Sequence, residues 1–334
     1  MIRSHVEIET LNHRARATLK NWISDVDVAL VDFPSHRNAG DSLIYMGQMA
    51  HFQALNVRVK YLADSGRYRA RDLKRRLPFG PILIQGGGNM GDRWVEMQEF
   101  REKVIAENRD RPIIQLPQSL DFSSPAKADQ ARKVYESHPD LTLLFREDRS
   151  LKRARELFPN TQSYFCPDLA LGAGPIAETA PPEVDVLFLI RDDSESAGHL
   201  IPRVRAGTTS ATTDWRLTSA SSLSWLAQRA PGIVARRVPS LLDPAYPLLV
   251  HNYRRMADIN MRNAIRVLSM GRVIVTDRLH ATVLAALLGR PVIALDNSTG
   301  KVSAVHSNLL KDISNVRIAP SGEAALQLAY EHLR

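Results

Sequence analysis

Short apolar runs alternate with amphipathic stretches along the chain. Each run is followed by a turn and then by a stretch with helical spacing, which is the pattern of parallel βαβ units. The strands predicted in the first half are Val28–Phe33, Val57–Leu62, Pro81–Gln85, Pro112–Leu116, Leu141–Phe145 and Ser163–Cys166. Those predicted in the second half are Val184–Ile190, Val273–Thr276, Pro291–Leu295 and Val316–Ile318. The pattern predicts an α/β protein with two Rossmann-like, doubly wound domains.

A segment rich in Gly and Pro separates the two series of strands. Residues 171–183 contain Gly-Ala-Gly-Pro and Ala-Pro-Pro-Glu, which interrupt helices and strands. We therefore expect a linker at 171–183, an N-terminal domain over residues 1–174 and a C-terminal domain over residues 184–334. The Thr-rich segment Gly207–Thr213 is predicted to be an exposed loop, and Gly322–Arg334 a final helix.

Composition narrows the class of protein. The apolar runs are far shorter than the ~20 residues of a membrane-spanning helix, and the first residues lack the apolar block of a secretory signal. We therefore expect a cytoplasmic protein. The single cysteine, Cys166, excludes an internal disulfide and a multi-cysteine zinc site. No set of His, Asp or Glu residues has metal-binding spacing, so a metal-free mechanism is predicted.

Net charge points to an anionic partner. The formal charge of +8 favours nucleic acid, anionic lipid head groups or a phosphorylated substrate. Aromatic residues make up only 6% of the chain and do not run beside the basic residues, which argues against base stacking on single strands. Nucleic acid is therefore the least favoured partner. The oligomeric state is unknown from the sequence.

Two polar clusters follow predicted strands of the first half. In the first cluster, Gly40 permits a tight turn between Asn38 and Asp41, and the next helix offers its amides to an anion. A helix cap by Asp41 or Ser42 is the alternative. The second cluster begins with three consecutive glycines, which a closely approaching ligand or chain segment would explain. Asp92 at its end is expected to bind a sugar hydroxyl or accept its proton, with a helix cap as the alternative.

Polar side chains also follow the next two predicted strands. Gln118 and Ser119 come after the first of these strands, and Arg146 comes after the second. A guanidinium can bind a carboxylate or phosphate through two parallel hydrogen bonds, so Arg146 is a candidate anion clamp. The alternative is a structural ion pair with Glu147 or Asp148.

The sharpest signal is the segment Asp277-Arg278-Leu279-His280, which lies between a strand and the apolar helix predicted over Ala281–Leu288. An arginine and a histidine two residues apart at a helix start combine an anion clamp, a proton carrier and the positive end of a helix. Asp277 is placed to orient either side chain. A lone histidine at a helix start is more often structural, but few structural roles require this combination.

One more polar turn follows the strand Pro291–Leu295. Ser298, Thr299 and Lys301 offer hydroxyls and an ammonium to a phosphate, next to another helix N-terminus. The alternative interpretation is an ordinary polar turn without a ligand. Like the other clusters, this one lies where a strand ends, which is where doubly wound sheets bind their ligands.

Taken in order, these motifs resemble those of the polysaccharide pyruvyl transferase family. The resemblance spans about residues 28 to 305 and rests on Asn38–Asp41, Gly86–Asp92, Pro117–Ser119, Arg146–Ser150, Pro167-Asp168, Asp277–Ala281 and Asp296–Lys301. It implies two domains that face each other across a cleft, as in glycosyltransferases of the B fold. It also implies phosphoenolpyruvate as donor substrate, no further cofactor, and a cyclic pyruvate ketal on two hydroxyls of one sugar. The segment Asp192–Leu242 lies outside the match.

The resemblance also implies roles for individual residues. Donor binding is expected from Arg146, Arg278, Leu279, His280, Ser298, Thr299 and Lys301. His280 is the first candidate for the general acid or base and Asp92 the second, with Arg278 as their catalytic partner. The acceptor side is expected to include Asn38, Gly40, Asp41, Gly87, Gly88, Asn89, Gln118 and Ser119. An acceptor in an exopolysaccharide or on a lipid-linked oligosaccharide fits the family, and a lipid carrier would bring the basic protein to the inner face of an anionic membrane.

Two other functions are open at this point. A glycosyltransferase of the same architecture would use a nucleotide sugar, but no clear carboxylate for ribose follows Val292–Asp296. A non-catalytic sugar- or phosphate-binding protein could keep the same scaffold. The joint presence of Arg146, Arg278 and His280 argues against it, since a degenerate site would have lost at least one of them.

Overall fold

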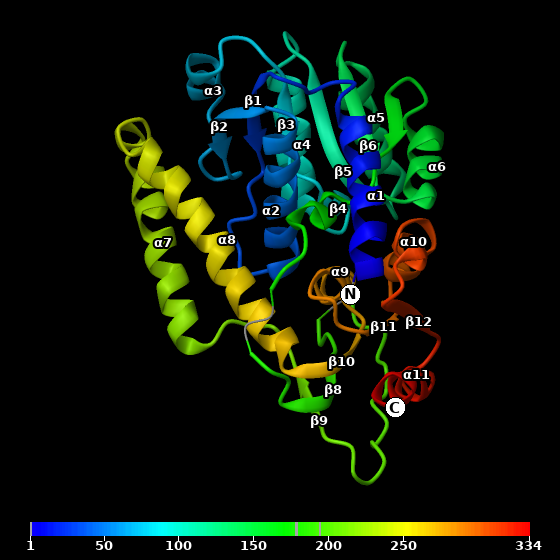
Figure 1. Cartoon of the computed structure of the whole chain (residues 1–334). Coiled ribbons are helices and arrows are strands. Elements are labelled where there is room, and N and C mark those ends of the chain that lie inside the picture. Colours follow the sequence, from blue (N-terminus) through cyan, green and yellow to red (C-terminus); the bar gives the residue numbers. More distant parts are fainter. Residues whose placement is uncertain (1, 178–179, 194) are drawn as a thin grey trace.

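Two parallel β-sheets, one from each half of the chain, form the framework of the molecule (Figure 1). The computed structural model describes residues 2–177, 180–193 and 195–334. Met1, and residues 178–179 of the predicted linker, lie outside the described residues. No helix in the described part of the chain is long and apolar enough to cross a membrane.

The first sheet has seven strands in the order β2-β1-β3-β5-β6-β7, and β4 pairs with β5. Its strands are β1 (Asp27–Val31), β2 (Arg58–Ala63), β3 (Ile82–Ile84), β4 (Gly87–Gly91), β5 (Ile113–Asp121), β6 (Leu141–Phe145) and β7 (Gln162–Phe165). All six predicted strands are confirmed. The glycine-rich segment, for which the sequence predicts no strand, forms β4, in which Gly87 and Gly91 pair with Gln118 and Asp121 of β5.

The second sheet has five strands in the order β12-β11-β10-β8-β9. Its strands are β8 (Val184–Leu189), β9 (Ser210–Thr213), β10 (Gly271–Thr276), β11 (Val292–Leu295) and β12 (Val316–Ala319). The prediction of an exposed loop over Gly207–Thr213 is wrong for its last four residues, which pair with β8 as an edge strand. The Thr side chains that suggested a loop also suit a strand with solvent on one side.

Helices cover both faces of both sheets. Those of the first half are α1 (Ile2–Leu19), α2 (Ala39–Ala54), α3 (Ala70–Arg76), α4 (Val95–Glu107), α5 (Pro125–Glu136) and α6 (Asp148–Leu157). Those of the second half are α7 (Ser219–Arg237), α8 (Tyr246–Ser269), α9 (Leu279–Leu287), α10 (Lys301–Asn308) and α11 (Gly322–Leu333). The predicted final helix is therefore confirmed as α11. Helices α3 to α6 pack on one face of the first sheet, while α1, α2 and α8 pack on the other.

The two halves share a hydrophobic core. Residues of α1, α2 and the short 3₁₀ helix η1 (Leu169–Ala173) pack in one buried cluster with α8, α9 and α10. The first three residues of the predicted linker thus belong to η1. Helices α7 and α8 belong to the second half in sequence but reach the first sheet, where Trp225 and Tyr253 join its core (Figure 1).

Each sheet reverses its strand order at one point. In the first sheet the reversal lies between β1 and β3, and in the second it lies between β8 and β10. Loops that leave neighbouring strands on opposite faces form a crevice at such a point, and ligands bind there in doubly wound folds. The fold therefore predicts a site formed by the loops that follow these four strands.

Candidate active site

A cavity of about 610 Å³ opens between the two sheets, next to both reversal points. Loops from both halves of the chain line it. The predicted residues that meet here are Asn38, Asp41, Gly88, Asn89, Arg146, Arg278, Leu279, His280 and Lys301. The two Rossmann-like sheets thus face each other across a cleft, as expected for the glycosyltransferase-B-like arrangement. This cavity is the candidate active site.

Arg146, Asp168 and His280 form a buried cluster at the wall of the cavity. Nη1 of Arg146 donates a hydrogen bond to Oδ2 of Asp168 over 2.7 Å and lies 3.2 Å from Nε2 of His280. The same Asp168 oxygen lies 3.4 Å from Nε2 of His280. Burial alone would raise the pKa of Asp168, but the charge of Arg146 and the contact with His280 outweigh it and hold this pKa below its usual range. Asp168 is therefore an anion that orients both neighbours.

The ion-pair partner of Arg146 is Asp168, which is not a partner that the sequence suggested. The alternative of an ion pair with Glu147 or Asp148 is wrong, because Glu147 accepts hydrogen bonds from Ser150 at the start of α6. Asp168 also caps η1 by accepting from the amide of Ala170 over 2.9 Å. Asp168 is thus both the cap of η1 and the counter-ion of Arg146.

The start of α2 reaches the ring of His280. Asn38 caps this helix, since its side chain accepts from the amide of Gly40 over 2.9 Å. The predicted cap by Asp41 or Ser42 is therefore wrong, and the side chain of Asp41 instead lines the cavity. A Cβ atom on Gly40 would lie 2.8 Å from Nδ1 of His280, closer than Cβ contacts come. Gly40 lines no cavity itself, but its lack of a side chain lets the two elements approach.

Strand β4 places Gly88 between two cations. A Cβ atom on Gly88 would lie 3.2 Å from Nη2 of Arg146 and 3.7 Å from Nζ of Lys301. Lys301 donates to the carbonyl of Gly88 over 3.1 Å and lies 3.4 Å from Oε1 of Glu195. Burial lowers the pKa of Lys301, and the charge of Glu195 acts in the opposite direction. The glycine-rich segment therefore leaves space in front of Arg146 and Lys301.

Three other predicted residues support this part of the wall from behind. Gln118 donates to the side chain of Asn89 over 2.9 Å and accepts from its amide. Ser119 accepts a hydrogen bond from Nε of Arg146 over 3.0 Å. Gly87 has a φ of +149°, which favours glycine there. None of Gln118, Ser119 and Gly87 is among the described residues that line the cavity.

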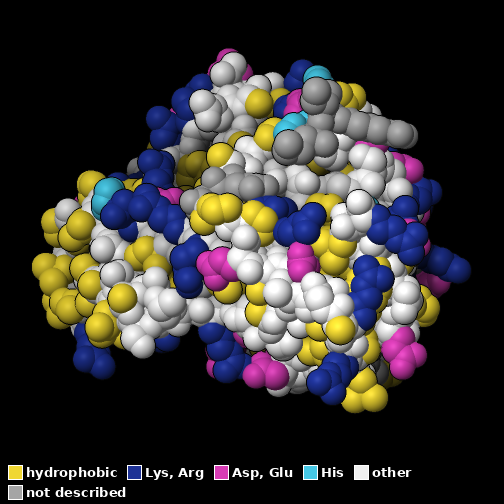
Figure 2. All heavy atoms as spheres, turned by 60° about the horizontal axis from the view of Figure 1, so that its bottom comes forward, with side chains coloured by type: hydrophobic (Ala, Val, Ile, Leu, Met, Phe, Trp, Pro, Cys, Tyr) yellow, Lys and Arg dark blue, Asp and Glu magenta, His cyan; other side chains and the backbone are white. Residues whose placement is uncertain are grey.

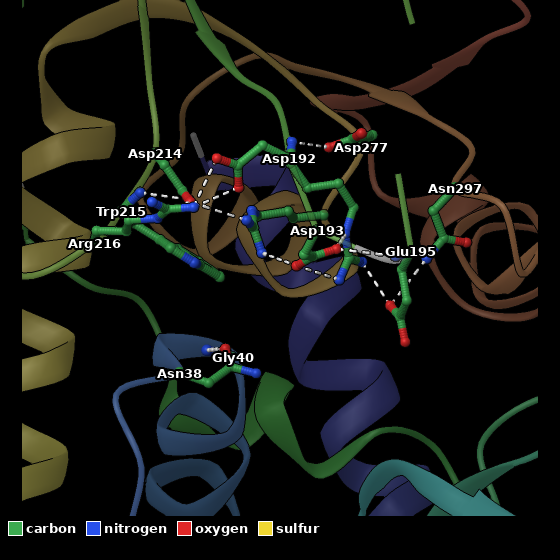
Figure 3. Close-up of polar contacts among 12 residues, drawn as sticks. Asn38, Gly40, Asp192, Asp193, Glu195, Asp214, Trp215, Arg216, Asp277 and Asn297 are labelled. Atoms are coloured by element: carbon green, nitrogen blue, oxygen red, sulfur yellow. Dashed lines mark hydrogen bonds and ion pairs between the residues drawn. The ribbon is translucent and has the colours of Figure 1, made fainter. Parts of the chain in front are cut away.

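Two more arginines of the cavity wall, Arg191 and Arg278, follow β8 and β10. Nη2 of Arg278 donates to Oδ2 of Asp214 over 3.0 Å, and Nη1 lies 3.7 Å from Asp193. Arg191 pairs with Asp193 over 2.7 Å and with Glu195 over 2.6 Å. Figure 3 shows Asp193, Glu195 and Asp214 gathered here, with Asn38 at the start of α2 on the other side of the opening. The carboxylates hold the guanidinium groups in place.

Helix α9 begins two residues earlier than predicted, with Arg278 at its N-cap position and His280 in its first turn. The hydroxyl of Thr276 accepts from the amide of Arg278 over 3.1 Å. Asp277 does not orient Arg278 or His280 as expected, because its Oδ1 accepts from the backbone amide of Arg191 over 2.9 Å. Asp277 therefore joins the ends of β8 and β10 instead of contacting the cavity.

Three predicted site residues lie away from the cavity. Asp92 accepts hydrogen bonds from the amides of Ser123 and Ser124, over 3.0 and 2.6 Å, at the start of α5. The hydroxyl of Thr299 donates to Asn297 over 2.9 Å. Ser298 is exposed. The structure thus supports the capping alternative for Asp92, and of the three residues predicted in the last polar turn only Lys301 lines the cavity.

The comparison with known families gives a match over most of the chain. The family model described as polysaccharide pyruvyl transferase matches residues 38–299. The chain belongs to this family. The matched region contains most of the cavity wall, although β1 and the cavity residues His36, Arg37 and Lys301 lie outside it. Membership in the polysaccharide pyruvyl transferase family identifies the chain as a transferase.

Two curated relatives of this protein are themselves named as pyruvyl transferases. The protein named "Pyruvyl transferase 1" of Schizosaccharomyces pombe is 32% identical over 295 residues, which cover 85% of this chain and 69% of the relative. The protein named "Putative pyruvyl transferase EpsO" of Bacillus subtilis is 27% identical, over 87% of this chain and 88% of the relative.

A solved structure shares the architecture. The crystal structure of a functionally uncharacterised protein from Klebsiella pneumoniae aligns with a TM-score of 0.62, over 93% of this chain and 99% of that one. The two sequences are 18% identical, so this likeness concerns the fold alone.

Several cavity residues were missed by the sequence analysis. They are His36, Arg37, Trp94, Met97, Arg191, Asp193, Glu195, Asp214, Trp215, Arg216 and Asn297. A signal was present for the group at the end of β8, because charged residues directly after a strand had marked the other clusters. Asp214 and Trp215 lacked this signal, because they follow β9, for which the sequence predicts a loop. Among the described residues, no group of three His, Cys, Asp or Glu side chains is arranged to hold a metal ion.

Proposed function

We propose that this enzyme transfers the pyruvyl group of phosphoenolpyruvate to two hydroxyls of one sugar, forming a cyclic ketal and releasing phosphate. The observation that carries the proposal is the meeting of Arg146, Arg278, Lys301 and His280 around one cavity. Phosphoenolpyruvate has two anionic groups, a carboxylate and a phosphate. Several cations that line one cavity can bind both groups of such a molecule.

The donor is held by the cations that have hydrogen-bonding capacity directed to the cavity. Nη1 and Nε of Arg146 are engaged with Asp168 and Ser119, which leaves Nη2 beside Gly88 for a ligand oxygen. Lys301 adds a point charge at the same place. Arg278 and the first-turn amides of α9 receive the second anionic group. The surrounding carboxylates fix these side chains before the substrate binds, which reduces the entropy lost on binding.

The chemistry requires one proton to be delivered and two to be removed. Protonation of the methylene carbon makes a methyl group and leaves positive character on the neighbouring carbon, which the first sugar hydroxyl attacks as it loses its proton. Cleavage of the bond to the phosphate oxygen then releases phosphate. Attack by the second hydroxyl closes the ketal, and its proton leaves with the phosphate. His280 is the group that we assign to proton transfer, because it lines the cavity beside Arg146 and an imidazole can both accept and donate a proton.

The rest of the cavity accommodates the sugar. A volume of about 610 Å³ is in the range of pockets that bind whole drug-sized ligands, so it leaves space beyond the small donor. Trp94, Met97 and Trp215 supply apolar surface there, and Asp41 supplies a hydroxyl acceptor. We propose a sugar of an exopolysaccharide or a lipid-linked oligosaccharide as the acceptor, in keeping with the family.

Phosphate release tests this proposal directly. Purified enzyme is incubated with phosphoenolpyruvate and a panel of glycosides, and release is expected to require both substrates. Mass spectrometry of the glycoside should show the gain of one pyruvate ketal. In parallel, titration calorimetry should show binding of phosphoenolpyruvate and none of UDP- or GDP-sugars. Binding of a nucleotide sugar, with sugar transfer and no phosphate release from phosphoenolpyruvate, would contradict the proposal.

A further inference from the structure

Helix α7 turns an apolar face to the solvent. Its side chains at helical spacing, which in a soluble protein normally mark a buried face, are here exposed. Leu223, Leu226, Ile233 and Val234 are 42 to 69% exposed, while Trp225 and Ala235 on the opposite side of the helix are buried. Figure 2 shows hydrophobic side chains gathered along the left edge of the molecule, where α7 lies outermost in Figure 1.

The apolar face continues past the end of α7. Val238 and Leu241 in the connection to α8, and Leu248 in the first turn of α8, are 42 to 50% exposed. We call the exposed residues of this hairpin the apolar ridge: Leu223, Leu226, Ile233, Val234, Val238, Leu241 and Leu248. Isolated exposed leucines are ordinary, but a contiguous row of this kind marks an interaction surface.

The charges around the ridge have one sign. Arg229, Arg236 and Arg237 lie on α7 and are exposed, and the helix contains no Asp or Glu. The first acidic residue after it, Asp243, is already paired with Arg75 and Arg76. An apolar face bordered by arginines complements the surface of an anionic bilayer, where anionic head groups cover the apolar acyl chains. A second copy of this chain would bring the same arginines and no carboxylate of α7 to match them.

The ridge adjoins the cavity at the start of α7. Thr218 caps the helix directly after Trp215 and Arg216, which line the cavity. On the other side, the guanidinium of Arg37, also a cavity residue, lies 5.4 Å from the centre of the Trp225 ring. A surface bound at the ridge therefore lies next to the opening through which an acceptor enters.

We propose that the apolar ridge docks the protein on anionic membrane lipids, with the leucines of α7 in the interface and the arginines at the head groups. Docking does not depend on the reaction proposed above, so the two are measured separately. If both hold, a sugar on a lipid carrier would reach the cavity without leaving the bilayer surface.

Vesicle sedimentation tests the proposal. The full chain is mixed with vesicles of phosphatidylcholine alone or with about one third phosphatidylglycerol, and it should sediment mainly with the anionic vesicles, less so at high salt. The double variant Leu226→Glu/Val234→Glu should lose at least ~10-fold in partition coefficient, because each buried apolar side chain contributes more than one tenfold step. Arg237→Gln should lose about fivefold. Phe79→Glu, at a position that is 88% exposed between α3 and β3, is the matched control and should bind as the parent does.

The outcomes separate docking from its alternatives. Phosphate release with a water-soluble glycoside should be unchanged in Leu226→Glu/Val234→Glu, which shows that the variant folds and that the cavity is intact. The proposal would be overturned if the parent chain did not sediment with anionic vesicles, or if the double variant sedimented with them as well as the parent does. A parent dimer that dissociates in the double variant, with no vesicle binding, would also overturn it and make the ridge an interface between copies.

Discussion

Nη1 of Arg146 lies 3.2 Å from Nε2 of His280, although Arg146 follows a strand of the first sheet and His280 a strand of the second. Asp168 touches both groups. The contact joins residues of the two sheets across the cleft. In the proposed reaction, it sets the distance between the donor's anionic group at Arg146 and the atom that exchanges a proton with His280.

Replacement of His280 tests its role in proton transfer. In His280→Gln we expect phosphate release to fall by about 10² to 10⁴, the usual contribution of a general acid or base. Binding of phosphoenolpyruvate, measured by calorimetry, should weaken much less, because Arg146 and Lys301 are untouched. His13→Gln, at an exposed position of α1, is the control. Turnover close to that of the parent would remove His280 from the mechanism.

Replacement of Asp168 should destabilise the protein in a pH-dependent way. Removing one partner of a buried ion pair costs about 3–5 kcal/mol, so Asp168→Asn should lower the free energy of unfolding in urea by that order. The pKa of Asp168 is lowered in the folded state, so its contribution is present above its unfolded pKa of about 4 and is lost as the pH falls through the folded value. The difference between parent and variant should therefore shrink in acid. A difference that is constant with pH would contradict the ion-pair assignment.

Gly40 offers a test of packing against the catalytic ring. A methyl group at this position meets Nδ1 of His280 at 2.8 Å, so Gly40→Ala should displace the ring. Alanine suits a helix better than glycine by up to about 1 kcal/mol, so stability should fall little. We expect kcat to drop at least tenfold while the melting temperature changes by a few degrees at most. Gly66→Ala, where the new methyl group meets only the flexible Arg236 side chain, should leave kcat unchanged.

Lys301 is predicted to act in donor binding. Lys301→Met keeps the length of the side chain but removes its charge beside Gly88 and Arg146. The KM for phosphoenolpyruvate should rise by about 10- to 100-fold, the loss of one charge-assisted hydrogen bond, while the KM for the sugar stays the same. Lys311→Met, at an exposed position, controls for the change in net charge. An effect on the sugar KM alone would place Lys301 on the acceptor side.

Asp32, which directly follows β1, predicts a second pH effect of opposite sign. Burial raises the pKa of Asp32 to about 7; Asp41 and Asp64 add to the shift and Arg101 opposes it. Between about pH 4 and 7 the folded protein holds a proton that the unfolded chain has released, so stability falls as the pH rises through this window. Asp32→Asn should remove this fall and stabilise the protein at pH 8 by a few kcal/mol, on the order of the pKa shift. Asp312→Asn, at an exposed position, should do neither.

The sequence predicted the sheets and much of the cavity wall because both follow from local signals. Buried parallel strands are continuous apolar runs, and their carboxyl ends meet at one edge of the sheet. This rule predicts Arg146 at the edge of one sheet and Arg278 at the edge of the other, and the family resemblance implied that the two edges face each other across a cleft. Strand β4 could not be predicted, because glycine is uncommon in strands. Its strand conformation depends on the pairing with β5.

Partners distant in sequence could not be predicted in the same way. Nothing in the segment around Asp168 marks it as the counter-ion of Arg146, since the choice among Asp168, Glu147 and Asp148 depends on how β6 and η1 meet in space. The role of Asp92 was ambiguous for a related reason, because a carboxylate after a glycine-rich segment can equally well hold a sugar or cap a helix. The exposure of α7 was also hidden, because its spacing of apolar residues is that of a buried face.

The hydrophobic core shared by α1, α2, η1 and α9 has a mechanical consequence. Enzymes whose two halves swing about a linker usually have a polar, hydrated seam between them. Here Leu43, Leu171 and Leu284 are buried in one cluster that spans the halves, so a wide swing would expose them to water at about 25 cal/mol per Å². Substrates should therefore enter through a mouth that changes by loop and side-chain motion. The spacing of Arg146 and His280 is set when the chain folds, before any substrate arrives.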